Sequence, residues 1–314
     1  MNTKIVFMGS PDFALPTLQL LADHYSVVGV VTQPDRPAGR GRRLKAPPVK
    51  KLAQKLELAI IQPRRLSQSE AVEQVQTWAP DLIVVAAFGQ LLGPEILELP
   101  PHGCLNVHAS LLPRWRGAAP INAAILHGDT EAGITIMKMD PGLDTGPIIS
   151  QRAIPIGPQE TAGSLFNKLA PLGAELLIDT LPAYLRGEIN PQPQDEAQAT
   201  YAPKLSRSDG KLDFDQPAKQ LARKVRAFHP WPGTYMRWHG DRLKIHQAHA
   251  ISATSPGVGV LSEHECFPAV GTSAGMLVLD KVQPACKKAM PGDAFLRGAR
   301  DWADRDQCKS SPYS

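Results

Sequence analysis

Residues 81–89, DLIVVAAFG, contain a continuous apolar run that begins after Asp81 and ends at Gly89. A half-exposed strand alternates apolar with polar residues, whereas a strand buried on both faces reads as a continuous apolar run. Strands of the second kind occur in parallel sheets that helices cover on both sides. The run therefore predicts a central parallel strand with an α/β fold around it.

Strand-like and helix-like stretches alternate on both sides of this run. Helical patterns occur at 13–24, 47–57 and 67–78, and the last begins with a Ser–x–x–Glu capping pattern at Ser67 and Glu70. Strands are expected at 4–9, 26–32, 58–63, 103–108 and 132–140, and a long amphipathic helix at 161–188. This alternation predicts a doubly wound α/β sheet with right-handed crossovers.

The pattern changes after residues 189–205, a stretch rich in Pro and Gln that we interpret as a linker. Beyond it, short strand candidates alternate with turns, at 233–238, 242–251, 257–261, 266–270 and 276–285. Several short strands within about 80 residues are typical of a small β-barrel of the OB type. We therefore expect an N-terminal domain at 1–188 and an OB-like C-terminal domain at 206–314.

Composition and cysteine spacing exclude several classes of protein. No apolar run approaches the roughly 18 residues of a membrane-spanning helix. The N-terminus, MNTKIVFMGSPDF, resembles neither a secretory signal nor a transit peptide. Cys104, Cys266, Cys286 and Cys308 show no CxxC pairing and no disulfide framework. We expect a cytoplasmic protein that does not bind membranes, and a monomer, because no coiled-coil pattern or extra apolar segment calls for a dimer.

Basic residues are unevenly distributed along the chain. The net charge is −1 over residues 1–205 and +5 over residues 206–314. Residues 32–51, TQPDRPAGRGRRLKAPPVKK, contain seven basic residues and one acidic residue. Pro and Gly lie between several of these arginines, which is typical of an exposed loop rather than of a helix face. Such a region either forms a solvated surface or binds a polyanion.

Three loops are candidates for a binding site, because ligands of open α/β sheets lie beyond the strand ends. They are residues 88–90, 106–117 and 140–146. Asn106 and His108 stand two residues apart, so their side chains share one face of a strand. An amide and an imidazole directed at one point can stabilise an oxyanion and move a proton, and a carboxylate at Asp144 would orient the imidazole.

Competing motifs are absent. The first strand–helix turn reads MGSPDFA rather than GxGxxG, which disfavours a dinucleotide site, and no P-loop is present. His264, Glu265 and Cys266 are consecutive, so their side chains point in different directions, and no second pair of ligands stands at metal-binding spacing. We expect no metal site.

Five stretches together resemble the methionyl-tRNA formyltransferase family: NVHASLLPRWRGAAP, MDPGLDTG, TQPDRPAGRGRRL, FHPWPGTY and QPACKKAM. The resemblance extends over nearly the whole chain. HxSLLP followed by GLDTG is specific to enzymes that take their formyl group from 10-formyltetrahydrofolate. The resemblance implies a Rossmann-like formyltransferase domain joined to an OB-like tRNA-binding domain. It also implies methionyl initiator tRNA as the partner and no metal cofactor.

The same resemblance assigns roles to individual residues. Asn106, His108 and Asp144 align with the catalytic triplet. The folate-binding residues it implies are Ser110, Leu111, Leu112 and Pro113, with the backbone near Phe88 and Gly89 expected at the pterin ring. From the charge of the basic loop we expect Arg40, Arg42, Arg43 and Lys45 to hold the acceptor end of the tRNA, because phosphate contacts position a nucleic acid without reading its sequence. Arg36 in the same loop is also expected to bind the tRNA. Lys287 and Lys288 are expected to extend this surface toward the tRNA body.

Three other functions use some of the same features. A formyltransferase acting on an amino-sugar nucleotide would share the catalytic domain but is not expected to have the Arg-rich insertion. A folate hydrolase would use water in place of the amine, and a dehydrogenase would need a further domain. A non-catalytic RNA-binding protein would have no use for Asn106, His108 and Asp144 together.

Overall fold

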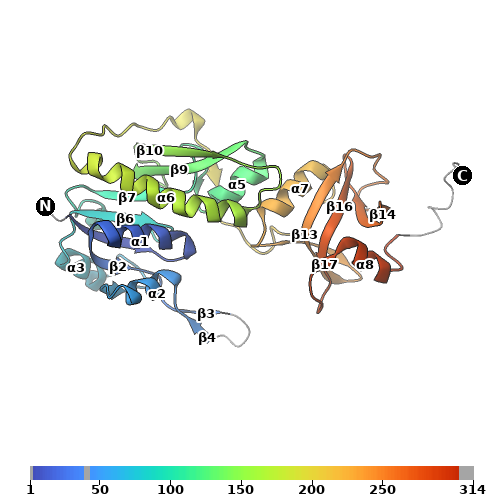
Figure 1. Ribbon diagram of the computed structural model, residues 1–314, viewed down its shortest axis with the longest axis horizontal. Helices are drawn as coiled ribbons and strands as arrows, with labels where there is room; N and C mark the ends of the chain where they lie inside the picture. Colours follow the sequence, from blue (N-terminus) through green and yellow to red (C-terminus); the bar gives the residue numbers. More distant parts are fainter. Residues whose placement is uncertain (1–2, 39–42, 304–314) are drawn as a thin grey trace, which may run out of the picture. The chain divides into compact units, whose positions relative to one another are not determined.

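The computed structural model describes residues 3–38 and 43–303, and its contacts divide the chain into two compact units (Figure 1). Unit 1 comprises the residues up to Ile121 together with Glu131–Pro155 and Ser164–Pro203. Unit 2 comprises Asn122–Thr130, Ile156–Gly163 and the residues from Lys204 onward. These units differ from the predicted ranges, because residues 122–130 and 156–163 group with unit 2, and residues 189–203 group with unit 1.

A seven-stranded sheet in the order β10-β9-β7-β6-β1-β2-β5 forms the centre of unit 1. Its strands are β1 (Lys4–Gly9), β2 (Ser26–Val31), β5 (Ile60–Ile61), β6 (Leu82–Ala86), β7 (Cys104–His108), β9 (Glu131–Lys138) and β10 (Ile148–Pro155). The five strands β7, β6, β1, β2 and β5, in sheet order, are parallel. β6 is buried at every position, as its apolar run predicts. The α/β class is confirmed.

β9 departs from the expected parallel arrangement, and β10 is a further strand that was not among those expected. β9 pairs with β7 in the antiparallel direction, and β10 pairs antiparallel to β9. The end of β9 therefore lies beside the start of β7, where Lys138 is paired with Leu105. Because the strand period is the same in both directions, the sequence of β9 contains no signal of its direction.

Helices lie against both faces of this sheet. The helices of unit 1 are α1 (Leu15–His24), α2 (Pro48–Lys55), α3 (Ser69–Thr77), α4 (Pro94–Leu97) and α6 (Ala162–Leu185), with short 3-10 turns η1 (Asp12–Ala14) and η2 (Glu196–Gln198). Most of α5 (Pro120–His127) groups with unit 2. α1 and α6 lie on the same side (Figure 1), and Phe13 of η1 contacts Phe166 of α6 at 5.6 Å between ring centroids. Gly173 permits α6 to approach the sheet closely, because a Cβ there would lie 2.8 Å from Val107. The opposite core combines alternate residues of β1 and β6 with α3 and α4.

The predicted capping box at Ser67 is wrong. α3 begins at Ser69, its N-cap is Gln68, and no side chain caps it. Ser67 therefore stands one position outside the cap, where its hydroxyl is out of register with the free amides of the first turn.

Unit 2 contains an antiparallel sheet in the order β12-β13-β16-β15-β14, with β17 paired to β16. Its elements are β12 (Thr234–Trp238), β13 (Asp241–Ile251), β14 (Leu261–His264), β15 (Phe267–Gly271), β16 (Met276–Gln283), β17 (Met290–Pro291), α7 (Ala218–Ala227) and α8 (Gly292–Gly298). Among the described strands no pairing joins β12 to β14, so this barrel-like sheet is open along that side. Residues 257–260 form a turn instead of the expected strand, since Gly257 and Gly259 have positive φ values of 122° and 75°.

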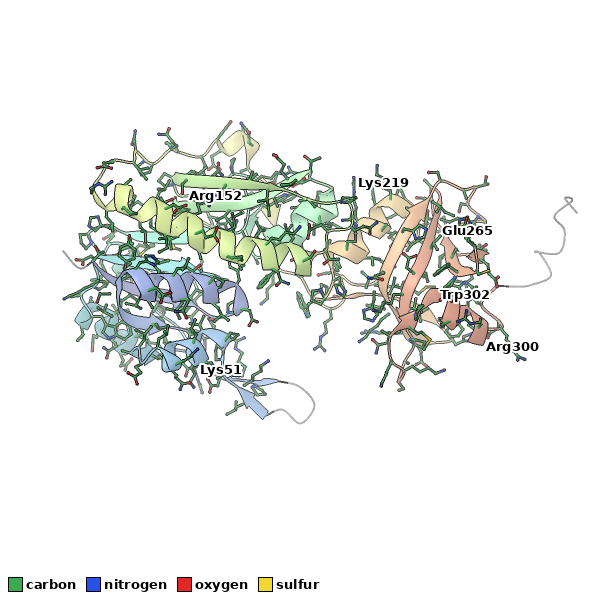
Figure 2. The ribbon with its side chains drawn as sticks, in the orientation of Figure 1. Lys51, Arg152, Lys219, Glu265, Arg300 and Trp302 are labelled. Atoms are coloured by element: carbon green, nitrogen blue, oxygen red, sulfur yellow. The ribbon has the colours of Figure 1, made fainter. Side chains whose placement is uncertain are left out.

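The core of unit 2 extends further along the chain than the sequence pattern indicates. Trp302 is 1% exposed and lies beside α8, while Arg300 is exposed at the surface (Figure 2). The Trp302 indole nitrogen donates to the Ser262 carbonyl at 2.8 Å, and its ring contacts Phe295 and Trp238.

Among the described residues, two small two-stranded sheets lie outside the main sheets. The small sheets are an antiparallel hairpin of β3 (Arg36–Ala38) and β4 (Arg43–Lys45), and a parallel pair of β8 (Arg116–Gly117) and β11 (Tyr201–Ala202). Within residues 3–38 and 43–303, no helix has the length and apolar character needed to cross a membrane. In the same ranges, no group of three or more His, Cys, Asp or Glu side chains could hold a metal ion.

Candidate active site

Asn106 and His108 lie on β7, which is buried at all its positions. They are 9% and 5% exposed, and the period of two along the strand places both side chains on one face. β6 pairs with β7 on one side, with Val85 opposite Asn106, and β9 pairs on the other, with Thr135 opposite His108. The two polar side chains are thus held on a rigid central strand.

The carboxylate of Asp144 lies between these two side chains and a backbone amide. The Asn106 amide nitrogen is 3.4 Å from Asp144 Oδ1, and His108 Nδ1 is 3.7 Å from Asp144 Oδ2. The Gly117 amide donates to Oδ2 at 2.8 Å. Asp144 has a positive φ of 54°, an uncommon conformation that Asp tolerates better than most residues. The structure therefore brings the three predicted residues together.

Asp144 reaches this place by a route that differs from the prediction. The prediction places the 140–146 loop at the carboxyl edge of the parallel strands. Because β9 is antiparallel to β7, its C-terminal end, which the loop follows, lies beside the start of β7 instead. The loop is internally bonded, since Asp140 Oδ1 accepts from the Gly142 amide and the Thr145 hydroxyl at 3.0 and 2.7 Å. At Gly146 any Cβ would collide with the Lys138 carbonyl oxygen.

The two nitrogens of the His108 ring have different neighbours. Nε2 lies 2.9 Å from the Trp115 carbonyl oxygen, which can only accept, so Nε2 carries a proton. Nδ1 is consequently the nitrogen that faces Asp144. A proton exchanged by this histidine during a reaction would enter or leave at Nδ1.

The loop after β7 is fixed by its own hydrogen bonds. The Ser110 hydroxyl donates to the Arg114 carbonyl at 2.6 Å, and Leu112–Pro113 is a cis peptide bond. Thr135 Oγ1 donates to the Ser110 carbonyl at 2.6 Å and accepts from the Leu112 amide at 3.0 Å. Ser110 and Leu112 are buried, while Leu111 and Pro113 are half-buried. The folate contacts expected of these four residues stay a prediction.

Phe88 and Gly89 lie just beyond the end of β6. The Phe88 side chain is 3% exposed and belongs to the core, and its carbonyl accepts from Gln33 Nε2 at 3.2 Å. Gly89 has a φ of +77°, and a Cβ added there would meet no atom within 4 Å. At this position only the backbone and open space beside it are available to a ligand.

The basic residues expected to bind tRNA belong to both units. Arg36 donates to Gln33 Oε1 at 2.9 Å. Lys45 lines a cleft of about 620 Å³ between α1 and α2 together with Lys51 and Lys55. Lys287 and Lys288 are exposed in the turn between β16 and β17 of unit 2. Arg40 and Arg42 lie outside the described residues, and only the backbone of Arg43 is described.

Comparison with known sequence families decides the classification. The profile of the family described as formyl transferase matches residues 3–181, and that of the formyl transferase C-terminal domain matches residues 204–300. The chain belongs to the formyl transferase family.

Relatives within this family are similar along most of their length. The methionyl-tRNA formyltransferase of Myxococcus xanthus (strain DK1622) is 47% identical over 295 residues, covering 94% of this chain and 95% of the relative. That of Geobacillus thermodenitrificans (strain NG80-2) is 48% identical over 301 residues, covering 95% and 94%.

Solved structures with low sequence identity share the fold. An N-formyltransferase from Helicobacter canadensis, in complex with folinic acid and dTDP-3-aminofucose, has a TM-score of 0.64 at 18% identity and covers 90% of this chain and 99% of its own. HypX from Aquifex aeolicus in complex with tetrahydrofolic acid has a TM-score of 0.60 at 18% identity. This match covers 95% of the present chain and 47% of the HypX chain.

Sequence reasoning missed the residues that hold the Asp144 loop in this formyl transferase. Arg116 is fully buried, and hydrogen bonds to Glu196 raise the pKa of its guanidinium above the usual value. Gln194 contacts both Arg116 and the carbonyls of Asp144 and Gly146. Gln194 and Glu196 stand in the segment interpreted as a linker, where nothing in the sequence marks them as partners of a residue about 80 positions earlier.

Proposed function

We propose that this chain transfers the formyl group of 10-formyltetrahydrofolate to the α-amino group of methionyl initiator tRNA, in the cytoplasm and as a monomer. The observation that carries the chemistry is the contact of the Asn106 amide and the His108 imidazole, which share one face of buried β7, with the carboxylate of Asp144 from the 140–146 loop. The substrate is supported by relatives named methionyl-tRNA formyltransferase, which match at 45–48% identity over about 95% of the chain. We also propose that residues 1–188 and 206–314 are the two functional domains, joined by residues 189–205.

In the reaction, the α-amino nitrogen attacks the formyl carbon and the formyl oxygen gains negative charge. Among the described residues, Asn106 Nδ2 is held only by a long contact of 3.4 Å to Asp144, so it can turn to donate to this oxygen. A protonated His108 would donate from Nδ1 toward the same point, because Nε2 is bonded to the Trp115 carbonyl. Donors of this kind, fixed in a buried site, stabilise charge that develops in the transition state.

Proton transfer from the attacking amine is assigned to Asp144 and His108. The amine must lose a proton as its bond to the formyl carbon forms, and the folate N10 must gain one as its bond to that carbon breaks. Asp144 Oδ1 lies beside Asn106, while Oδ2 accepts from Gly117. The carboxylate is therefore oriented to accept the proton that the amine loses, directly or through one water. The protonated His108 supplies from Nδ1 the proton that N10 gains, and the proton on Asp144 then restores the charged imidazole.

The folate assignment draws on the chemistry of the site and on the relatives. An amide donor, an imidazole and a carboxylate fit acyl transfer from a carbonyl donor and require no metal ligand set. Solved family members have been described with tetrahydrofolic acid and with folinic acid. We assign the loop of Ser110, Leu111, Leu112 and Pro113 and the backbone at Phe88 and Gly89 to the folate.

An amino-sugar nucleotide is the second candidate acceptor, because the Helicobacter canadensis protein of similar fold has been solved with dTDP-3-aminofucose. The β3–β4 hairpin and its basic residues favour tRNA, since a small nucleotide sugar needs no such extended cationic element.

The test is formyl transfer from 10-formyltetrahydrofolate to methionyl initiator tRNA by the parent and by Asn106→Ala and His108→Ala. We expect transfer by the parent and a loss of about 100- to 1000-fold in kcat in each variant, the usual cost of removing one oxyanion donor. His24→Ala, an exposed histidine at the end of α1, is the matched control and should retain full activity. Full activity in the Asn106 and His108 variants would refute the assigned site.

A further inference from the structure

The side chain of Gln194 connects a buried arginine to the loop that carries Asp144. Its Oε1 accepts from Arg116 Nε and Nη2 at 3.0 and 2.9 Å. Its Nε2 donates to the carbonyl oxygens of Asp144 and Gly146 at 2.8 and 2.7 Å. Two donated and two accepted bonds use the full capacity of a primary amide, so one rotamer of Gln194 satisfies every contact.

Arg116 is itself fixed on the side opposite the loop. Its guanidinium is 0% exposed and makes a bidentate pair with Glu196, Nη1 to Oε2 at 2.9 Å and Nη2 to Oε1 at 2.7 Å. A buried guanidinium must be paired, because an unpaired buried charge is strongly destabilising. Arg116, Gln194 and Glu196 therefore form one hydrogen-bonded set, which we name the strap.

Asp144 is held from two directions, by the strap and by Gly117. Gln194 holds the Asp144 main-chain carbonyl, and Gly117, the residue after Arg116, holds the Asp144 carboxylate through its amide at 2.8 Å. The positive φ of Asp144 is an uncommon conformation that persists only where the surroundings enforce it. Without these bonds, the loop has less to keep the carboxylate beside Asn106 and His108.

We propose that Gln194 is a positioning residue for formyl transfer, which acts through the main chain of Asp144, with Arg116 and Glu196 orienting its amide. This inference rests on the proposed function, in which Asp144 is a catalytic residue. A glutamate at this position could not donate to two carbonyls, and an asparagine is one methylene too short to reach both Arg116 and the loop. The strap thus gives the segment 194–196 a part in the site of unit 1.

The test uses Gln194→Met, which keeps the length of the side chain and removes all four hydrogen bonds. We expect kcat for formyl transfer to fall about 10- to 100-fold, because a misplaced catalytic group is costly even when no contact to substrate is lost. KM for both substrates should change by less than about twofold, since no binding contact is removed. Gln192→Met is the matched control: this exposed side chain in the same segment donates only to the Asn190 carbonyl, and its loss should change neither parameter.

The decisive readout is the same substitution in an Asp144→Asn background. If Gln194 acts through Asp144, the second substitution lowers kcat by less than about twofold there, because two groups of one unit are not additive. A full additional loss in that background would overturn the proposal, as would unchanged kcat in Gln194→Met alone. If Asp144→Asn itself retains full activity, the catalytic assignment fails, and that result is distinct from a failure of the strap alone.

A second variant covers the case in which Gln194→Met does not fold. Glu196→Gln leaves Gln194 in place and removes one anchor of Arg116. We expect a smaller fall in kcat, about 3- to 10-fold, that again disappears in the Asp144→Asn background. Unchanged kcat in folded Glu196→Gln would show that Glu196 has no part in the strap's action on Asp144.

Discussion

At the scale of single residues, the site depends on how each polar atom is held. The proton on His108 Nε2 is fixed by the Trp115 carbonyl, and Asp144 Oδ2 by the Gly117 amide. These bonds leave Asn106 Nδ2 facing Asp144 Oδ1, and His108 Nδ1 facing Asp144 Oδ2. The backbone of the 109–117 loop thus sets which atoms of Asn106, His108 and Asp144 can meet a substrate.

Cys104 lies two residues before Asn106 and provides a test of burial at this strand. It is 1% exposed, its thiol donates to the Ile96 carbonyl at 3.5 Å, and burial raises its pKa to about 12 from 9.0. Thiolate is the reactive form, so Cys104 should resist iodoacetamide at pH 8 while the exposed Cys266 and Cys286 react. Peptide mass spectrometry follows each cysteine separately, and rapid native labelling of Cys104 would contradict the buried strand.

The same pKa shift predicts a change of stability at alkaline pH. Above pH 9 the unfolded thiol loses its proton while the folded thiol keeps it up to about pH 12. The stabilisation is therefore fully present below pH 9 and is lost as pH rises, with a slope of up to about 1.4 kcal/mol per pH unit. Denaturant unfolding between pH 8 and pH 10.5 should show a steeper loss in the parent than in Cys104→Ala; equal slopes would refute the shift.

Part of the site follows from sequence at this scale and part does not. Asn106 and His108 share a face because the strand period is two, which a sequence contains directly. Asp144 stands 38 positions from Asn106, and Gln194 stands 78 positions from Arg116. Contacts at such separations depend on strand order and loop conformation. Asp144 was a candidate because its loop follows a predicted strand, whereas nothing of that kind points to Gln194, and the strap was missed.

At the scale of elements, the basic hairpin of β3 and β4 is the feature that favours tRNA over a smaller acceptor. It projects Lys45 toward the cleft that Lys51 and Lys55 also line. The described part is a paired ribbon, and Leu44 on it is 71% exposed. A cationic ribbon with an exposed edge is well suited to following a phosphate backbone.

Arg43→Ala and Lys45→Ala should weaken binding of methionyl initiator tRNA and leave folate affinity unchanged. Each lost phosphate contact should lower the slope of log K against log salt by about 1. Arg152→Ala on β10, whose guanidinium pairs with Asp179 at 2.9 Å, is the control and should retain the parental slope. Unaltered tRNA affinity and salt slope in both hairpin variants would exclude the hairpin from the tRNA interface.

Most elements were predictable, and the errors have physical causes. Apolar runs and helical periods identify β1, β2, β6, β7 and α6 because they reflect burial, which those elements share. The antiparallel direction of β9 is set by its pairing with β7. α3 begins after Gln68, whose side chain makes no capping hydrogen bond, so the capping pattern at Ser67 does not mark the start of the helix. Residues 257–260 read as a strand by composition, but two glycines with positive φ turn the chain there.

At the scale of the whole molecule, the chain combines a unit that holds the candidate active site with a second unit that has its own core. Trp302 completes that second core, with its ring against Phe295 and Trp238. Trp302→Ala should cost about 3–5 kcal/mol, the usual range for removing a buried aromatic side chain. Calorimetry should show a lower unfolding temperature for unit 2, whereas Arg300→Ala, an exposed neighbour, should leave it unchanged. Equal unfolding temperatures in the parent and Trp302→Ala would contradict this packing.

The most direct test of the proposed function is a competition for one formyl donor. The purified chain is given 10-formyltetrahydrofolate labelled in its formyl carbon, with equal concentrations of methionyl initiator tRNA and dTDP-3-aminofucose. We predict that mass spectrometry finds the label as formylmethionine on the tRNA and none on the sugar nucleotide. Label on the sugar nucleotide with none on the tRNA would contradict the proposed acceptor while retaining the formyl transfer site.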